Sequence, residues 1–463
     1  MARSSGQLRR DALDIWRAGV EAVRPERLMA ECLRVEGRRL WVGDERFDLG
    51  RVRRIAVVGA GKAGAAMAAA VEAILGEPLM AEKNLIGWVN VPADTLRPLG
   101  RITLHPARPP GVNEPRPEGV VGAERIVEIL HALGPDDLCL CLISGGGSAL
   151  LPAPAEGVSL ADLIEVTRYL SAAGANIEQL NTVRKQLDRL KGGGLSRECN
   201  AGRLVALIVS DVLGDPLDMI ASGPTVQDRS APRDALRVLE AFAARDGGVP
   251  LAVFEHLERK EHAPPAPPKC RVTNLVIGNN ATAVAAAGDR ADRLGYEPAM
   301  ISADRSEGRA EDVGRHLAEM ALRMRRAEGP NCLVSGGEPV VELVEPSRRG
   351  LGGRNQQLAL AALAALGEDG ASGIALVAGG TDGEDGPTDA AGAVVDADVI
   401  ARSAQLGLDP RDYLARNDAY HFFRPLDALL CTGPTGTNVC DLRVVVVDRP
   451  APRQPGGAAN SSP

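Results

Sequence analysis

The sequence predicts an α/β protein with largely parallel sheets, and two observations carry this fold class. Short apolar runs, typical of buried strands, end repeatedly in polar loops that contain glycine. Segments that suit helices separate most of these junctions, as expected where parallel strands alternate with helices. Since ligands bind outside the carboxyl ends of such strands, we expect the functional residues in these loops. The junctions lie at 54–64, 138–149, 207–215, 275–280, 332–339, 375–386 and 429–438.

A chain of 463 residues is too long for one hydrophobic core, so we expect two or three domains. The proline-rich stretch HAPPAPPK at 262–269 is the best linker candidate. It separates an N-terminal α/β domain at 1–268 from a C-terminal α/β domain at 269–447. Each is expected to be a Rossmann-like, three-layer domain, with an interdomain cleft between them. The tail at 448–463 is rich in Pro, Gly, Ala and Ser, which predicts disorder.

The remaining segments fit this alternation in chain order. Apolar residues at helical spacing predict a helix at 7–30, and a short hairpin follows around Glu36-Gly37. After the first strand, AAMAAAVEAIL is a strong helix former. The later elements that we expect are an apolar segment at 85–91, helices at 118–133, 159–174 and 181–194, and a last strand at 443–447.

Composition narrows the function classes. Aromatic residues make up 3% and the net charge is −8, which argue against base stacking and general nucleic-acid binding. The eight cysteines include no C-x-x-C pair, which fits buried thiols in a reducing cytosol. We see no signal peptide and no apolar run of membrane-spanning length. We therefore expect a cytoplasmic monomer or homodimer that binds a small molecule and neither nucleic acid nor membrane.

The loop after the apolar run 138–143 is the clearest candidate for binding an anion. Three successive glycines let the backbone turn its N–H groups toward one point, as in a phosphate-binding nest. A flexible turn between strand and helix is the alternative reading. The residues of this loop are Ser144, Gly145, Gly146, Gly147 and Ser148.

The loop GAGKAG at 59–64 has the G-x-G-x-x-G spacing of a dinucleotide-binding turn. Two details weaken that interpretation: Lys62 occupies the loop itself, and no acidic residue ends the next apolar segment to hold a ribose. At a helix N-terminus, Lys62 is better understood as a point charge aimed at a phosphate or carboxylate. An exposed loop lysine without a role is the alternative.

Charged residues gather in three further segments. The stretch 181–194 carries Arg184, Lys185, Arg189 and Lys191 on one predicted helix, either as a solvated face or as the basic wall of a ligand cleft. In GGRNQQ, Arg354 offers a planar fork for a carboxylate or phosphate. The loop TDGEDGPTD offers Asp382, Asp385 and Asp389, as a magnesium site, a catalytic base or a solvated turn. Its spacing is not that of an EF-hand.

Several of these segments closely resemble one known family, and the resemblance covers nearly the whole chain from the first strand to Val447. The family is that of the class II glycerate kinases, the glycerate 2-kinases that end in a MOFRL domain, some of which are labelled hydroxypyruvate reductases. The segments are 140–154 (LCLISGGGSALLPAP), 181–194 (NTVRKQLDRLKGGG), 208–225 (IVSDVLGDPLDMIASGPT), 335–338 with 352–357, 381–391 and 432–442.

The resemblance implies transfer of the γ-phosphoryl group of ATP to the 2-hydroxyl of D-glycerate, with a divalent metal such as Mg²⁺. Lys62 and Arg354 match basic residues of the family's active site. We expect Asp382 or Asp385 to accept the hydroxyl proton and Asp211 and Asp389 to hold the metal. The expected binding residues are Ser144 to Ser148, Arg184, Lys185, Lys191, Gly192, Gly193, Asn279, Glu338 and Asn355.

Two other functions remain open from the sequence. An NAD(P)H-dependent hydroxypyruvate reductase would use GAGKAG as its cofactor loop. The lysine in this loop and the absence of an acidic residue to hold the ribose count against this function. A non-catalytic nucleotide sensor would leave the many carboxylates beside glycine loops without a purpose. Neither the Walker motif nor the protein-kinase motifs occur, so phosphoryl transfer here would need another phosphate cradle.

Overall fold

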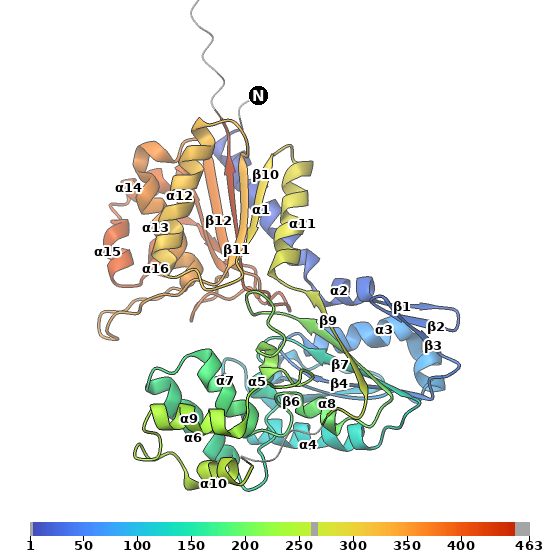
Figure 1. Ribbon diagram of the computed structural model, residues 1–463. Coiled ribbons are helices and arrows are strands. Elements are labelled where there is room, and N and C mark those ends of the chain that lie inside the picture. The colour runs from blue at the N-terminus through green and yellow to red at the C-terminus, as the bar shows by residue number, and fades with distance from the viewer. Residues whose placement is uncertain (1–2, 261–266, 450–463) are drawn as a thin grey trace, which may run out of the picture. The chain divides into compact units, whose positions relative to one another are not determined.

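The computed structural model describes residues 3–260 and 267–449, which form two compact units, each around a six-stranded sheet (Figure 1). We call residues 23–279 with 436–439 the parallel-sheet unit. The mixed-sheet unit consists of residues 3–22, 280–435 and 440–449. The predicted cleft between two domains stays a prediction.

The parallel-sheet unit is built on six parallel strands in the order β6-β5-β4-β7-β8-β9. Strand β7 is buried at every residue, because helices cover both faces of the sheet. Apolar side chains of α4 join one face, and α3 lies against β4, β5 and β7 on the other. The bounds are β4 Arg54–Ala60, β5 Ile86–Pro92, β6 Ile102–Arg108, β7 Asp137–Ile143, β8 Arg203–Val209, β9 Arg271–Gly278, α3 Gly64–Glu82 and α4 Pro117–His131.

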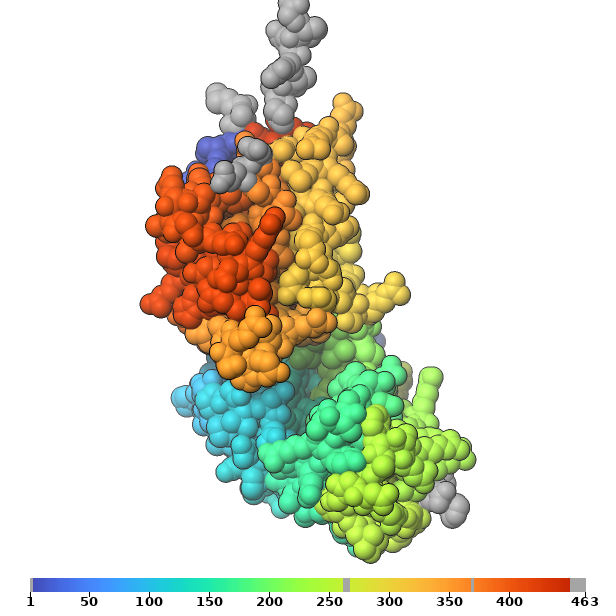
Figure 2. Space-filling view, turned by 90° about the vertical axis from the view of Figure 1, so that its left-hand side faces the viewer, coloured from blue at the N-terminus to red at the C-terminus, as the bar shows by residue number. Residues whose placement is uncertain are grey.

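Four further helices of this unit pack around a separate hydrophobic core that includes Leu170, Val183, Leu239 and Phe254. Figure 2 shows these helices, in green and yellow-green, gathered on one face of the unit. They are α6 Leu160–Ala172, α7 Ile177–Gln186, α9 Pro232–Ala241 and α10 Leu251–Lys260. The unit is completed by α2 Pro25–Cys32, α5 Gly147–Leu150, α8 Gly194–Glu198, the short helices Ala93–Thr95 and Ile220–Ser222, and a small antiparallel sheet of β1 Leu33–Glu36, β2 Arg39–Val42 and β3 Glu45–Asp48.

The mixed-sheet unit has the strand order β10-β11-β15-β12-β13-β14. Only the pair β10–β11 is parallel, because β15 runs back between β11 and β12 and pairs antiparallel with both. Strands β13 and β14 continue the antiparallel pairing. The bounds are β10 Pro298–Ser302, β11 Cys332–Gly337, β12 Ile374–Gly380, β13 Gly392–Asp396, β14 Leu429–Leu430 and β15 Asp441–Val447.

Helices cover both faces of this second sheet as well. Helices α1 and α11 share one hydrophobic core with the strands, and α12 and α13 share another. Both units therefore have three layers. The bounds are α1 Ser5–Ala22, α11 Asn280–Arg293, α12 Ala310–Arg326, α13 Arg354–Gly370, α14 Ala397–Gln405, α15 Pro410–Ala415, α16 Ala419–Phe423 and the short helix Arg424–Leu426.

These observations confirm the α/β class. Parallel pairing holds throughout the first sheet, but in the second it is confined to β10–β11. The predicted helix at 7–30 is two helices, α1 and α2, because Pro25 starts a new one. The predicted helix at 181–194 is wrong as a single element: α7 ends at Gln186, and Gly192 and Gly193 take the left-handed backbone that L residues avoid.

The units divide the chain differently from the predicted boundary at 268/269. Helix α1 belongs to the mixed-sheet unit, and β9 belongs to the parallel-sheet unit because it pairs with β8. Residues 262–266 of the predicted linker and residues 450–463 of the predicted tail lie outside the described residues.

Helix α3 is the one described helix that is long and apolar enough to cross a membrane, by length and composition alone. That is weak support for a membrane span, since buried helices of other proteins meet the same criterion. Its helical backbone is interrupted at Gly76, where φ is 71°, and it packs on the parallel sheet. We therefore interpret α3 as a sheet-covering helix.

Candidate active site

Lys62 lies on the loop after β4, and this loop is tied to the glycine loop after β7. The Lys62 N–H donates to Gly145 O at 2.8 Å, and the Ala63 N–H donates to Ser144 Oγ at 3.0 Å. A Cβ atom at Gly61 would lie 2.0 Å from Ser144 Oγ, so the close approach of the two loops requires glycine there. The structure therefore brings the Lys62 loop and residues 144–148 together.

The glycine loop itself has the shape of an anion nest. Gly146 takes the left-handed conformation, with φ of 77°. Within residues 3–260 and 267–449, the N–H groups of Gly145 and Gly146 have no hydrogen-bond acceptor. A Cβ atom at Gly145 would lie 2.2 Å from Asp211 Oδ2, which puts that carboxylate directly beside the loop. Two open donors and a neighbouring carboxylate suit a phosphate and a cation that bridges to it.

The two serines of the loop have internal partners. Ser144 is buried and holds Ala63, as described above. Ser148 Oγ shares a hydrogen bond of 2.8 Å with Ser222 Oγ, which in turn donates to Asn181 Oδ1. Gly147 packs against Ala221: a Cβ atom at Gly147 would lie only 2.7 Å from the Cβ atom of Ala221. These contacts hold the loop in shape and leave Gly145 and Gly146 as its open part.

The basic residues of 184–193 do not form one wall. The Lys185 ammonium pairs with Asp218 at 3.1 Å, and Lys191 is buried and pairs with Asp188. The N–H groups of Gly192 and Gly193 donate to Ser222 O and Gly223 O. Both N–H donors are therefore used within the protein, and the role of these two glycines in binding a reactant stays a prediction.

Arg184 and Asn279 have different surroundings. Arg184 Nε donates to Thr167 Oγ1 at 3.4 Å, and burial lowers the pKa of its guanidinium. Asn279 follows β9, and its side-chain amide donates to Asp215, which has a left-handed backbone. Arg189 pairs with Glu124 at 2.8 Å. Of these, Asn279 lies at a carboxyl end of the sheet.

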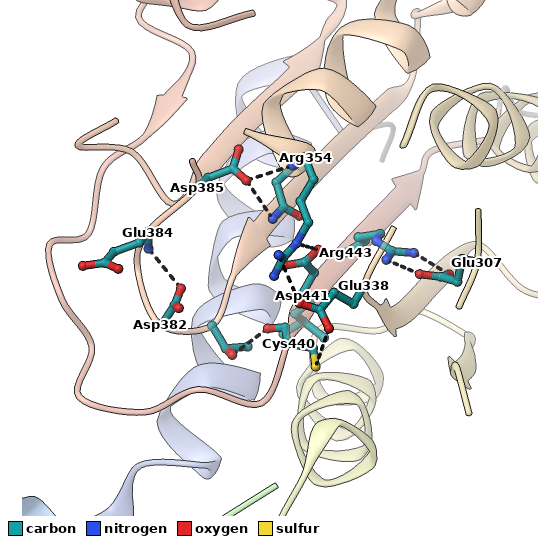
Figure 3. A network of polar contacts seen from close by, with 12 residues as sticks. Glu307, Glu338, Arg354, Asp382, Glu384, Asp385, Cys440, Asp441 and Arg443 are labelled. Atoms are coloured by element: carbon teal, nitrogen blue, oxygen red, sulfur yellow. Dashed lines mark hydrogen bonds and ion pairs between the residues drawn. The ribbon is translucent and has the colours of Figure 1, made fainter. Parts of the chain in front are cut away.

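In the mixed-sheet unit, Arg354 lies in a cluster of carboxylates (Figure 3). Its Nε donates to Asp441 Oδ2 at 2.8 Å and its Nη2 to Asp441 Oδ1 at 3.0 Å, which is a bidentate pair. Its Nη1 lies 3.1 Å from Glu338 Oε1. Asp441 is fully buried, whereas 34% of the Arg354 side chain is exposed. The cluster therefore holds Arg354 in one orientation and leaves part of its guanidinium open.

The charges in this cluster influence each other. Burial alone would lower the pKa of Arg354, but the carboxylates of Asp441 and Glu338 raise it by more. Burial raises the pKa of Glu338, while Arg354 acts against that rise. Arg354 therefore stays a cation, and the pKa of the Glu338 carboxyl lies above that of an exposed glutamate.

Asp385 serves the N-terminus of α13. Its Oδ1 accepts the N–H of Asn355 at 3.0 Å and its Oδ2 accepts the N–H of Gln356 at 2.9 Å. These are donors that the first turn of a helix leaves unpaired. Burial raises the pKa of Asp385 to about 7, although both N–H donors favour the charged form. Asn355 is fully buried against Asp385, so neither residue offers an open surface.

Asp382 and Asp389 lie at the two ends of the same acidic loop. Asp382 is partly exposed, and its Oδ1 accepts the N–H of Glu384 at 3.1 Å. Asp389 is exposed and accepts the hydroxyl of Tyr420 at 2.8 Å. Among the described residues, no three Cys, His, Asp or Glu side chains come together as a metal site.

Sequence reasoning missed two residues of these clusters. Asp441 lies in the segment 432–442, which the sequence marks only by the family resemblance, and its place beside Arg354 follows from β15 lying beside β11 and β12. Arg108 ends β6, and its Nη2 would lie 3.1 Å from a Cβ atom at Gly146. The signal that could have found Arg108 is its place at the end of an apolar strand, before a proline-rich loop.

Comparison with known proteins adds a second line of observation. Residues 11–258 match the family described as a domain of unknown function (DUF4147), and residues 331–441 match the MOFRL family. The D-glycerate 2-kinase of Thermotoga maritima is 36% identical over 445 residues, which cover 95% of this chain and 98% of that relative. A putative hydroxypyruvate reductase of Agrobacterium vitis is 39% identical over 398 residues, covering 85% of this chain and 99% of that protein.

A solved structure agrees with these matches. The crystal structure of glycerate kinase from Thermotoga maritima has a TM-score of 0.80 against this chain at 35% identity. The alignment covers 96% of this chain and 100% of the other.

Proposed function

Because this chain belongs to the glycerate kinase family, with a DUF4147 region and a MOFRL region, we propose that it phosphorylates D-glycerate with ATP. The products would be 2-phosphoglycerate and ADP. The observation that carries the proposal is the nest after β7: two open N–H groups at Gly145 and Gly146, on a loop bonded to the backbone of Lys62. Phosphoryl transfer depends on positioning and charge neutralisation, which such a site can supply.

Each cluster has a proposed role in this reaction. The open N–H groups of the nest and the Lys62 ammonium would bind phosphate oxygens. Arg354 has five N–H donors, and its contacts with Asp441 and Glu338 among the described residues use three of them, which leaves two for an anionic reactant. The fixed fork of Arg354 would orient a carboxylate or phosphate. The Lys62 ammonium would stabilise the negative charge that develops in the transition state.

Asp211 fits a magnesium ligand better than Asp389 does. Its carboxylate lies beside the nest, so it could share a cation with a phosphate bound there. Mg²⁺ is often bound by one or two carboxylates together with substrate phosphates and water. When bound, the ion would neutralise charge on the phosphoryl oxygens. The exposed Asp389 already accepts a hydrogen bond from Tyr420.

Asp382 is the better candidate for the residue that accepts the hydroxyl proton. Both oxygens of Asp385 accept backbone N–H bonds, and only 3% of that residue is exposed. Asp382 is partly exposed on the same loop. We therefore assign Asp385 to holding α13 and Asp382 to the reaction.

The assay that tests the function compares two reactions of the purified protein. One contains D-glycerate and Mg·ATP, and the other contains hydroxypyruvate and NADH. We expect turnover only in the first, with phosphorus NMR showing phosphate on the 2-hydroxyl. The reductase name of one relative makes the second reaction the relevant rival. Turnover with NADH alone would overturn the proposal, and a 3-phosphate product would overturn its regiochemistry.

The structure contains one observation that argues against the reductase. Strand β5 ends in Asn90-Val91-Pro92, so no acidic residue occupies the strand end where a ribose hydroxyl would be held. The first acid, Asp94, follows in the short helix Ala93–Thr95. We also propose a cytoplasmic location, because the cysteine pattern of the sequence fits buried thiols in a reducing compartment.

A further inference from the structure

Arg108 is a buried cation at the carboxyl end of β6. Only 5% of the residue is exposed. Its Nη1 donates to Val112 O and, at 3.3 Å, to Asn113 Oδ1. Its Nη2 points to the other side, toward Gly146, where a Cβ atom would lie 3.1 Å away. The same Cβ atom would lie 3.5 Å from Lys62 Cγ, so the side chains of Arg108 and Lys62 both lie beside Gly146.

The charge of Arg108 lacks a close counter-ion. Among the described residues, no carboxylate lies within 4 Å of its guanidinium, and its buried Nε has no hydrogen-bond partner. Burial lowers the pKa of Arg108, and only the more distant charge of Asp94 acts in the other direction. A buried charge without a partner is costly, and proteins usually compensate it with an opposite charge.

We propose that Arg108 is a further anion-binding residue, and that an oxyanion of a reactant bound at the nest is its missing counter-ion. Two sets of donors lie there, the Arg108 Nη2 and the open N–H groups of Gly145 and Gly146, and the Lys62 side chain passes beside Gly146 at its Cγ. A planar guanidinium beside two backbone donors suits a phosphate or carboxylate group. The inference rests on the proposed function for the identity of the reactants.

The oxyanion has two sources in the proposed reaction, a phosphate of the nucleotide and the carboxylate of glycerate. Both would present paired anionic oxygens, and the contacts of Arg108 alone do not separate them. Binding titrations do, because ADP and inorganic phosphate carry only the first group and D-glycerate carries only the second.

The test is Arg108→Gln, with Arg125→Gln as the control. Arg125 is exposed on α4 of the same unit and pairs with Glu128, so its loss removes one positive charge away from the nest. Binding of ADP, inorganic phosphate and D-glycerate is measured by calorimetric titration. We expect Arg108→Gln to weaken either the phosphate ligands or glycerate by about ten- to a hundredfold, as for the loss of a charged hydrogen bond. Arg125→Gln should change both by less than about twofold.

Arg108 could bind an anion or could only hold its own loop, and the two roles predict different results. If it only holds the loop through Val112 and Asn113, the folded Arg108→Gln protein should bind all three ligands as the wild type does, and that result would overturn the inference. Asn113→Ala, which removes one internal partner and no charge, should leave binding nearly unchanged. Should Arg108→Gln not fold, Arg108→Lys carries the same test, since it keeps the charge and loses the planar fork.

These titrations also separate this inference from the proposed function. If the wild-type protein shows no turnover of glycerate with ATP and yet binds phosphate in an Arg108-dependent way, the function is wrong and the anion site stands. If turnover is normal and Arg108→Gln binds every ligand normally, the function stands and the anion-binding role is wrong.

Discussion

At the scale of single residues, Lys62 and Arg354 present positive charge in two ways. Arg354 is held by a bidentate pair with Asp441 and by Glu338, so its orientation is set before a ligand binds. Lys62 is fixed at its backbone, through Gly145, and carries its charge on a flexible stem. A preoriented fork suits ground-state binding, and a compact point charge suits the developing charge of a transition state.

This difference leads to a prediction for Lys62→Ala. If the ammonium acts on the transition state, kcat should fall by on the order of a hundredfold or more, while KM changes much less. Steady-state kinetics with ATP and glycerate measure both. Lys269→Ala, which removes an exposed lysine of the same unit, is the control and should leave kcat unchanged. A rise in KM with normal kcat would instead show that Lys62 anchors a reactant.

Asp385 leads to a prediction about stability and pH. Because burial raises its pKa to about 7, the folded protein holds a proton on Asp385 that the unfolded chain releases near pH 4. The native state then binds more protons than the unfolded state, so this residue's contribution to stability is full at acid pH and is lost as pH rises toward about 7. Asp385→Asn cannot titrate, so its unfolding free energy should fall less over that range.

Urea unfolding of both proteins at several pH values measures this difference. Only the slope with pH is compared, because an amide replaces one of the two acceptors that cap α13 and lowers stability at every pH. Asp398→Asn, at an exposed site of α14, is the control for removing a carboxylate of the same unit. Equal slopes for wild type and Asp385→Asn would show that folding does not raise the pKa of Asp385.

At the scale of elements, the strand-to-helix junctions depend on close backbone approach. In the loop between β7 and α5, Gly145 leaves room for the Asp211 carboxylate, and Gly146 turns the chain with a left-handed backbone. In the loop before α13, a Cβ atom at Gly353 would lie 2.3 Å from the Asp385 carboxyl carbon. These glycines are thus required by neighbouring carboxylates as much as by chain flexibility.

We therefore expect Gly145→Ala to damage the site while the unit remains folded. The new methyl group would displace Asp211 and change the nest, so kcat/KM should fall at least about tenfold, as for other misplaced catalytic groups. Gly134→Ala is the matched control, because a Cβ atom there finds its nearest neighbours at 3.7 Å and 4.0 Å. Steady-state kinetics of both variants measure kcat/KM, and circular dichroism shows whether each variant is folded. Normal activity of a folded Gly145→Ala enzyme would remove Asp211 and the nest from the mechanism.

At the scale of the whole molecule, the two units are interleaved along the chain. Helix α1 comes from the N-terminal end but belongs to the mixed-sheet unit, and residues 436–439 belong to the parallel-sheet unit. The chain thus passes between the units after residues 22, 279, 435 and 439. Neither unit corresponds to a single continuous segment, so cutting the chain at the predicted linker would separate α1 from the sheet that it covers.

Nucleotide binding supplies a prediction for the whole molecule. If the nest binds phosphates as proposed, saturating Mg·ADP should stabilise the folded protein by a few kcal/mol, as expected for any ligand that binds only the native state. NADH should give no comparable effect, since β5 ends without a ribose-binding acid. Thermal unfolding with each ligand measures both. A shift with NADH and none with Mg·ADP would reverse the assignment of the GAGKAG loop.

The sequence by itself determined the local parts of this protein. The apolar runs at 54–60 and 138–143 are strands, and the loops after them carry Lys62 and the open glycines, because period and turn chemistry depend on near neighbours alone. The motifs also singled out Lys62 and Arg354, and the family resemblance implied that both belong to the active site. The local pattern was wrong at 181–194, where it predicted one helix. There the helix ends early, before the buried ion pair of Lys191 and the left-handed glycines.

Only the tertiary structure decided which distant residues meet. Arg108 reaches Gly146 because β6 lies in the same sheet as β7, and Asp441 reaches Arg354 because β15 runs between β11 and β12. Asp385 caps the N-terminus of α13, so we assign it a structural role and keep Asp382 as the candidate for the reaction. Strand order and direction arise from non-local packing, and a sequence pattern with a period of a few residues carries no information on them.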